Sequence, residues 1–202
     1  MGTVVLCDLD ADELLMEIEM LDPDTSVFNI GFTRCAFDAE CAKRLFSRCP
    51  NLNEIHLNQL EFDGIDLATV EILSSFIGSQ DCHLQNIVLG PNKVAEGGIE
   101  LLANGLISNK SIVTLDISNI DISVAAFSNL IHALQCNVSI QYLNLSYCNL
   151  QDTNLQTLAD SLTTTERVFE FRGNDAITPS GKAYLQNKIR ELESSATAVT
   201  YA

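Results

Sequence analysis

Two segments decide the fold: "IVTLDISNIDI" (residues 112–122) and "IQYLNLSYCNL" (residues 140–150), which begin 28 residues apart. Both have apolar residues at their first, fourth, sixth and eleventh positions, and so does "LQNIVLGPNKV" (residues 84–94), which begins 28 residues earlier. Alternation around the fourth and sixth positions predicts a short strand with those two side chains buried. The sequence therefore predicts a series of stacked, similar units.

The period continues outward with less regularity. "LNEIHLNQLEF" (residues 52–62) and "VFNIGFTRCAF" (residues 27–37) fit it, and a degenerate copy follows near residues 169–177, so that five to six repeats are visible. After each eleventh position, apolar residues recur at helical spacing, as Leu155 and Leu158 do. This predicts that a helix returns the chain to the start of the next strand.

The pattern L-x-x-L-x-L-x-x-(N/C)-x-L resembles the leucine-rich repeat family, and the 28-residue spacing resembles its ribonuclease-inhibitor-like subclass. The resemblance covers roughly Val27 to Leu192. It implies an α/β solenoid, shaped as a horseshoe or arc, with a parallel sheet on the concave side and helices on the convex side. A single unit cannot bury its own apolar stripe, but stacked units share a continuous core.

Three segments are expected on this basis. Residues 1–26 are predicted to form an acidic N-terminal cap, with an amphipathic helix at about residues 12–21. Residues 27–193 are predicted to form the leucine-rich repeat domain, and residues 194–202 a frayed C-terminal tail. The chain of 202 residues is long enough for one medium domain with a substantial core.

The charge balance excludes several kinds of partner. With 27 acidic residues against 11 basic ones, the formal net charge is -16. Such a chain repels nucleic-acid phosphates and anionic membrane surfaces, and it favours a protein partner with a basic patch. The acidic residues are dense in residues 1–26, and no Lys or Arg precedes Arg34. That segment is either a solvated cap or a docking site for a basic partner.

The seven cysteines are an odd number without C-x-x-C pairs. The N-terminal residues resemble neither a secretory signal nor a myristoylation site, and no apolar run is as long as a membrane span. We therefore expect a cytoplasmic protein with reduced thiols. The N-x-S triplets at Asn109, Asn137 and Asn144 are accordingly not expected to be glycosylated.

Cys148 is the residue that most resembles a catalytic candidate. The period, however, places it at the ninth position of its unit, where other units have Asn92, Ile120, Leu60 and Cys35. A nucleophilic thiol needs a nearby base, and the period brings none of His56, His83 and His132 to these cysteines. Cys148 is predicted to hold the turn from inside the stack, and we expect no catalytic centre, metal site or cofactor.

The period also predicts which side chains the sheet exposes. The third, fifth and seventh positions of each unit should face outward, and the eighth position follows at the end of the strand. We expect the protein-binding residues to be Glu54, His56, Asn86, Asp116, Tyr142, Asn144, Tyr147 and Arg172. Tyr142 and Tyr147 are the expected anchors, because exposed aromatic side chains are favoured at binding hot spots.

The resemblance implies a non-enzymatic protein-interaction module (a scaffold, sensor or inhibitor) that presents its concave face to a protein partner. Two alternatives stay open. One is a GTPase regulator similar to the Ran GTPase-activating protein, although this chain lacks a long acidic C-terminal tail and its loops are poor in arginine. The other is a bacterial effector that binds a host protein in the host cytosol. An enzyme that uses Cys148 is the last alternative.

Overall fold

Strands and helices alternate along the whole chain. The computed structural model describes residues 2–22, 27–60, 64–163, 167–192 and 198–200. The strands in these residues are β1 (Gly2–Cys7), β2 (Val27–Thr33), β3 (Glu54–Asn58), β4 (Asn86–Val88), β5 (Thr114–Asp116), β6 (Tyr142–Asn144), β7 (Val168–Glu170) and β8 (Ala198–Thr200). The helices are α1 (Ala11–Met20), α2 (Ala39–Arg48), α3 (Leu67–Ile77), α4 (Gly98–Ser108), α5 (Val124–Cys136), α6 (Asp152–Ser161) and α7 (Pro179–Glu191).

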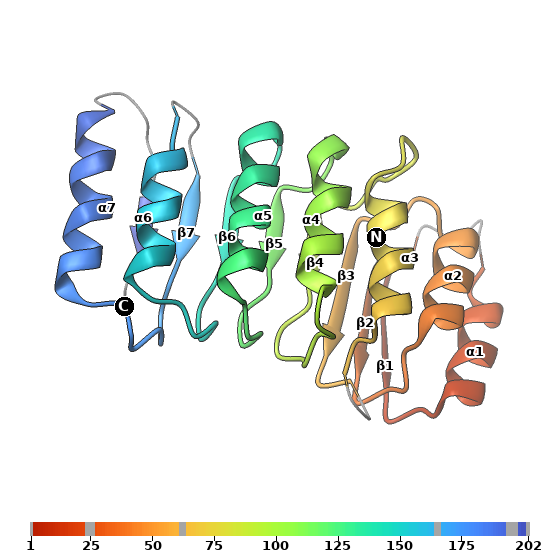
Figure 1. Ribbon diagram of the computed structural model, residues 1–202. Coiled ribbons are helices and arrows are strands. Elements are labelled where there is room, and N and C mark those ends of the chain that lie inside the picture. The colour runs from red at the N-terminus through yellow and green to blue at the C-terminus, as the bar shows by residue number, and fades with distance from the viewer. Residues whose placement is uncertain (1, 23–26, 61–63, 164–166, 193–197, 201–202) are drawn as a thin grey trace.

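The strands form a single parallel sheet in chain order, from β1 to β8. From β2 to β7, each strand residue pairs with the residue at the same repeat position in the next unit, as Asn86 pairs with Thr114 and Thr114 with Tyr142. The helices lie side by side in one layer that covers one face of the sheet (Figure 1). The α/β class and the solenoid-like stacking of similar units are thus as predicted.

The core lies between the sheet and the helix layer. Leu115 and Ile117 of one unit, and Leu143 and Leu145 of the next, occupy the fourth and sixth positions and are at most 1% exposed. Most helices begin at a residue whose side chain accepts a backbone amide of the first turn; these are Asp10, Asp38, Asp66, Ser123 and Thr178. Such caps fix the residue at which these five helices begin.

The stack extends further at both ends than the sequence predicted. The helix expected at about residues 12–21 is Ala11–Met20, but it is preceded by β1, which pairs with β2 in the register of the repeat. This first unit is shorter than the period, because only 26 residues separate Val4 from its partner Ile30. In the tail that was predicted to be frayed, residues 198–200 pair with β7 as strand β8. Residues 193–197 and 201–202 lie outside the described part.

Candidate protein-binding face

We call the face of the sheet that none of the described helices covers the open face (Figure 1). Its side chains come from the third and fifth positions of the strands, which are half-buried in β3 to β7 while the residue between them is buried. The predicted alternation is therefore correct for these positions. It is wrong at the seventh position of two units, because Gly90 and Ser146 are buried. There the strand has ended, and both residues contact a neighbouring unit: Gly90 lies against Ser118, and Ser146 accepts the amide of Asn119.

The centre of the open face carries a fixed pair, Asp116 and Asn144. The Nδ2 atom of Asn144 donates to Oδ2 of Asp116 at 2.8 Å. Each side chain also accepts a hydrogen bond from a backbone amide two residues further along. Oδ1 of Asp116 accepts the amide of Ser118 at 2.9 Å, and Oδ1 of Asn144 accepts the amide of Ser146 at 3.0 Å. An ionised carboxylate has about four acceptor sites, so these bonds orient Asp116 without saturating it.

Tyr142 and Glu170 complete this central cluster. Burial, followed by the hydrogen bond to Glu170 and the negative charges of Glu170 and Asp116, raises the pKa of Tyr142 to about 12. The phenol thus keeps its proton at neutral pH and donates it to the carboxylate of Glu170. Tyr142 is half-buried and lies within the face, whereas the sequence predicted an exposed anchor. Glu170 was not among the predicted site residues, although it shares the fifth repeat position with Asp116 and Asn144.

A second group of predicted residues lies on β3 and β4. Nε2 of His56 and Oε1 of Glu54 are 2.6 Å apart, and Asn86 pairs in register with Glu54. Val88 of β4 pairs with both His56 and Asp116 and so separates this group from the central cluster. The structure thus divides the predicted residues of the strands into two neighbouring groups.

Tyr147 and Arg172 lie at the rim, where the strands end. Tyr147 occupies the eighth position of its unit and has a left-handed backbone, with φ 58°. Non-glycine residues at the eighth position of four other units share this conformation: Asp8, Arg34, Gln59 and Asn119. The amide of Tyr147 donates to the carbonyl oxygen of Arg172 at 2.7 Å, and such bonds between units hold a conformation that is otherwise unfavourable.

The side chain of Tyr147 borders a cavity at the rim. It is 51% exposed, and its ring lies against Gly173, where an added Cβ would be only 2.2 Å from two ring carbons. The cavity has a volume of about 420 Å³ and is lined by Pro91, Asn92, Lys93, Val94, Asn119, Asp121 and Tyr147. Of the two predicted anchors, Tyr147 is therefore the one that protrudes.

Cys148 lies inside the stack, as predicted. Its side chain is 0% exposed, and its thiol donates to the carbonyl oxygens of Ile117 at 3.2 Å and of Ser146 at 3.5 Å. Burial raises the pKa of Cys148 to about 12, so the thiol is protonated at neutral pH. Cys35 has the same place in its own unit and is also buried. These thiols serve as hydrogen-bonding rungs between units.

No model of a known protein family matches the chain, and no curated protein sequence matches it either. Across the described ranges, His, Cys, Asp and Glu side chains do not gather in threes as a metal-ligand set. In the same part of the chain, every helix is too short or too polar to cross a membrane. The open face and its rim remain the features from which a function can be inferred.

Proposed function

We propose that this chain is a non-enzymatic protein-interaction module of the leucine-rich repeat type, and that its open face binds a protein partner. The parallel strands in chain order, the single helix layer and the buried residues at the ninth position support the repeat type. Solenoids of this kind offer an extended surface along which neighbouring units each contribute a few side chains.

The central cluster is the observation that carries this proposal. Asp116 and Asn144 are held in place before any partner arrives, and Tyr142 is oriented by its bond to Glu170. Side chains that are already ordered lose little conformational freedom on binding, so their contacts contribute more of their energy to affinity. A polar cluster that is fixed and still accessible is therefore suited to recognition.

The chemistry of the cluster indicates a basic side chain on the partner. Two carboxylates, Asp116 and Glu170, flank Asn144 on adjacent strands. The planar guanidinium of an arginine is complementary to this arrangement. It donates hydrogen bonds to carboxylates in pairs, and it stacks on an aromatic ring such as that of Tyr142. The net charge of -16 would also speed the approach of a basic partner at low ionic strength.

Affinity capture followed by a binding measurement tests this proposal. Proteins captured from cells by the wild-type chain would be identified by mass spectrometry and purified, and their dissociation constants measured. Asp116→Lys is expected to weaken a specific partner by about tenfold or more, because it places a positive charge in the cluster. Glu71→Lys is the matched control, since Glu71 is exposed on helix α3 and the substitution makes the same change of two charges. Equal affinities for the two variants would contradict binding at the open face.

A further inference from the structure

Among the described residues, β1 is the outermost strand of the sheet, and the core is only partly covered there. Strand β1 pairs with β2 on one side, and no other described strand lies on its second side. Its inward side chains Val4 and Leu6 remain partly exposed, whereas their partners Ile30 and Phe32 in β2 are 1% and 0% exposed. This end therefore lacks the neighbour that covers every internal unit.

The rest of the stack shows which backbone groups of β1 face outward. The third-position amide of each unit donates to the preceding unit, as Tyr142 N–H donates to Val113 at 3.1 Å. The fifth-position carbonyl accepts from the preceding unit, as that of Asn144 accepts from Ile117 at 3.1 Å. In β1 these positions belong to Thr3 and Val5. The outer edge of β1 thus presents a donor and an acceptor in the spacing of a parallel partner strand.

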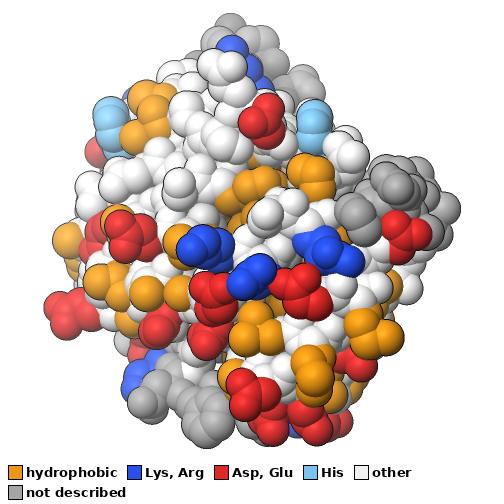
Figure 2. Space-filling model, turned by 90° about the vertical axis from the view of Figure 1, so that its right-hand side faces the viewer, with side chains coloured by type: hydrophobic (Ala, Val, Ile, Leu, Met, Phe, Trp, Pro, Cys, Tyr) orange, Lys and Arg blue, Asp and Glu red, His pale blue; other side chains and the backbone are white. Residues whose placement is uncertain are grey.

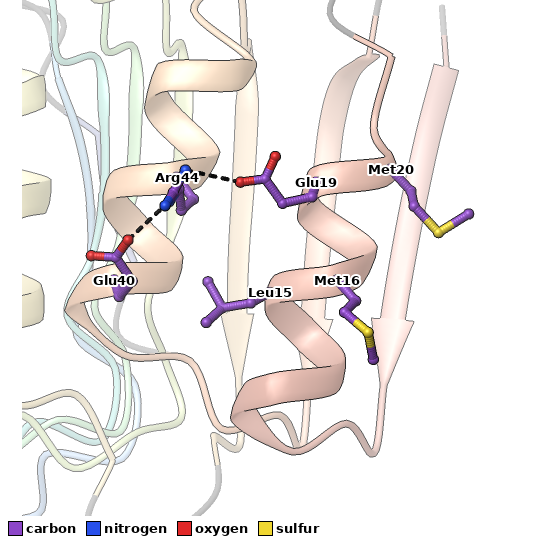
Figure 3. A pocket seen from close by; sticks show the side chains of 6 residues that line it. All are labelled: Leu15, Met16, Glu19, Met20, Glu40 and Arg44. Carbon is purple, nitrogen blue, oxygen red and sulfur yellow. Dashed lines mark hydrogen bonds and ion pairs between the residues drawn. The ribbon is translucent and has the colours of Figure 1, made fainter.

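Apolar side chains surround this edge. Val5 is 62% exposed, and on helix α1 Met16 is 62% and Met20 76% exposed. Both methionines point away from helix α2, while Leu15 points toward it (Figure 3). Helices α1 and α2 together line a groove of about 480 Å³. Its lining residues are Met16 and Met20, together with Leu15, Glu19, Glu40 and Arg44. Methionine side chains adapt their shape readily, which suits them to covering a partner of variable sequence.

Negative charge surrounds the same end. Glu13 and Glu17 are exposed on α1, and they share with Met16 and Met20 the spacing of one helix face. Residues 2–33 contain no Lys or Arg. Figure 2 looks onto this end and shows Asp and Glu side chains interspersed with hydrophobic ones, around a central group of Lys and Arg side chains. Arg44 and Arg48 of helix α2 pair with Glu19. The edge strand itself, "GTVVLC", has neither a charged residue nor a proline to prevent a further strand from pairing with it.

We propose that the free edge of β1 binds an extended, lysine- or arginine-containing segment of another protein, which pairs with β1 as an added parallel strand. The apolar side chains of the segment cover Val4, Leu6 and the two methionines, and its basic side chains lie near Glu13 and Glu17. A second copy of this chain is the poorer occupant, because two identical ends would bring the same acidic residues together. This site is separate from the central cluster of Asp116, Tyr142, Asn144 and Glu170 and does not depend on the function proposed for that cluster.

A synthetic peptide with alternating lysine and valine, acetyl-KVKVKVK-amide, serves as the probe. Its affinity for the full chain is measured by fluorescence anisotropy, and its location by the backbone amide shifts of Gly2 to Cys7. We expect binding that shifts these resonances and that weakens with salt. In an extended peptide, the valine amides lie along one edge and the lysine amides along the other. N-methylation of all valines, or of all lysines, therefore removes the donors of one edge only. The peptide methylated on the edge that pairs with β1 should bind about tenfold or more weakly than the parent.

Two pairs of variants locate the site. Val5→Lys should weaken the peptide by about tenfold or more, while Val124→Lys, which adds the same charge on helix α5, should have a much smaller effect. Thr3→Pro removes an outward donor and should weaken binding, whereas Thr3→Ala retains that donor and should not.

Three results would overturn the proposal. The first is equal affinity of both methylated peptides and the parent, which would exclude strand pairing. The second is loss of binding in Asp116→Lys but not in Val5→Lys, which would place the peptide on the open face and leave the proposed function intact. The third is a peptide-free dimer, seen by sedimentation equilibrium, that Val5→Lys dissociates; this would assign the edge to a second copy of the chain.

Discussion

Oδ1 of Asn174 accepts the backbone amide of Cys148 at 3.0 Å, across the boundary between two units. The same oxygen accepts the amide of Leu150 at 2.9 Å. Nδ2 of Asn174 donates to the carbonyl oxygens of Leu145 and Phe171, both at 2.9 Å. One amide side chain thus satisfies two donors and two acceptors that the strand-to-helix turn would otherwise leave unpaired inside the stack.

Asn174→Ala should lower the free energy of unfolding by at least about 2 kcal/mol, because each buried group left without a partner costs about 1–3 kcal/mol. Urea denaturation followed by circular dichroism measures this change. Asn187→Ala is the control, since Asn187 is exposed on helix α7, and it should change stability by no more than about 0.5 kcal/mol. Similar losses in the two variants would mean that the buried bonds of Asn174 contribute little.

Thiol labelling should separate the cysteines by burial. Cys7 and Cys136 are exposed, whereas Cys35, Cys41, Cys49, Cys82 and Cys148 are buried. We expect iodoacetamide to modify the two exposed residues in the folded protein and the other five only after denaturation, as read by mass spectrometry of the digested chain. Native-state modification of Cys148 at the rate of Cys136 would contradict its place inside the stack.

Alkaline pH should destabilise the fold through its buried thiols. Burial raises the pKa of Cys148, and likewise that of Cys41, from an ordinary value of 9.0 to about 12. Between these values the unfolded chain loses the proton that the folded chain retains. The free energy of unfolding therefore falls as pH rises, by up to about 1.4 kcal/mol per pH unit for each thiol, and the effect is absent well below pH 9.

Urea denaturation between neutral pH and about pH 10.5 measures this slope. Cys148→Ala removes one of the two thiols and should show a shallower decline than the wild type, even though its stability at neutral pH is lower. Parallel slopes in the two proteins would show that Cys148 does not titrate differently in the folded and unfolded states.

The period predicted the burial of most residues but not the polar bonds between units. Asn109 and Asn137 are 28 residues apart, and each precedes a serine by two residues. Both are buried: Nδ2 of Asn109 donates to Ile77, and Nδ2 of Asn137 to Leu106. The equal spacing was a usable signal for a second ladder. The sequence pattern alone does not show that the acceptors are backbone carbonyls of the preceding unit. Every residue has a backbone carbonyl, so the residue type does not indicate which one accepts the bond.

The sequence predicted on which strands the residues of the candidate site lie, but not which hydrogen bonds their side chains make. The repeat placed Asp116 and Asn144 on neighbouring strands, which the structure confirms. How far a tyrosine at the third position is exposed depends on its rotamer and on its neighbours, and here Tyr142 is half-buried and hydrogen-bonded to Glu170. Strand β1 was missed because the acidic helix that follows it resembles a cap rather than the helix of a repeat unit.

An added methyl group should destabilise the fold strongly at Gly90, which follows β4, and little or not at all at Gly31 in β2. A Cβ at Gly90 would lie 1.9 Å from the carbonyl oxygen of Ser118, a backbone atom of the next unit that cannot move without displacing β5. A Cβ at Gly31 would lie 3.8 Å from its nearest neighbour, the Cβ of His56, which is ordinary van der Waals contact.

Gly90→Ala should therefore cost about 3 kcal/mol or more of unfolding free energy, or prevent folding, because its unit must separate from the next one to admit the methyl group. Gly31→Ala should leave stability within about 1 kcal/mol of the wild type or raise it, since alanine reduces the freedom of the unfolded chain. Thermal and urea unfolding of both variants provide the comparison. Equal destabilisation of the two variants would mean that the units move apart easily at Gly90. Close packing of β4 against β5 would then be excluded as the feature that sets the register of the stack.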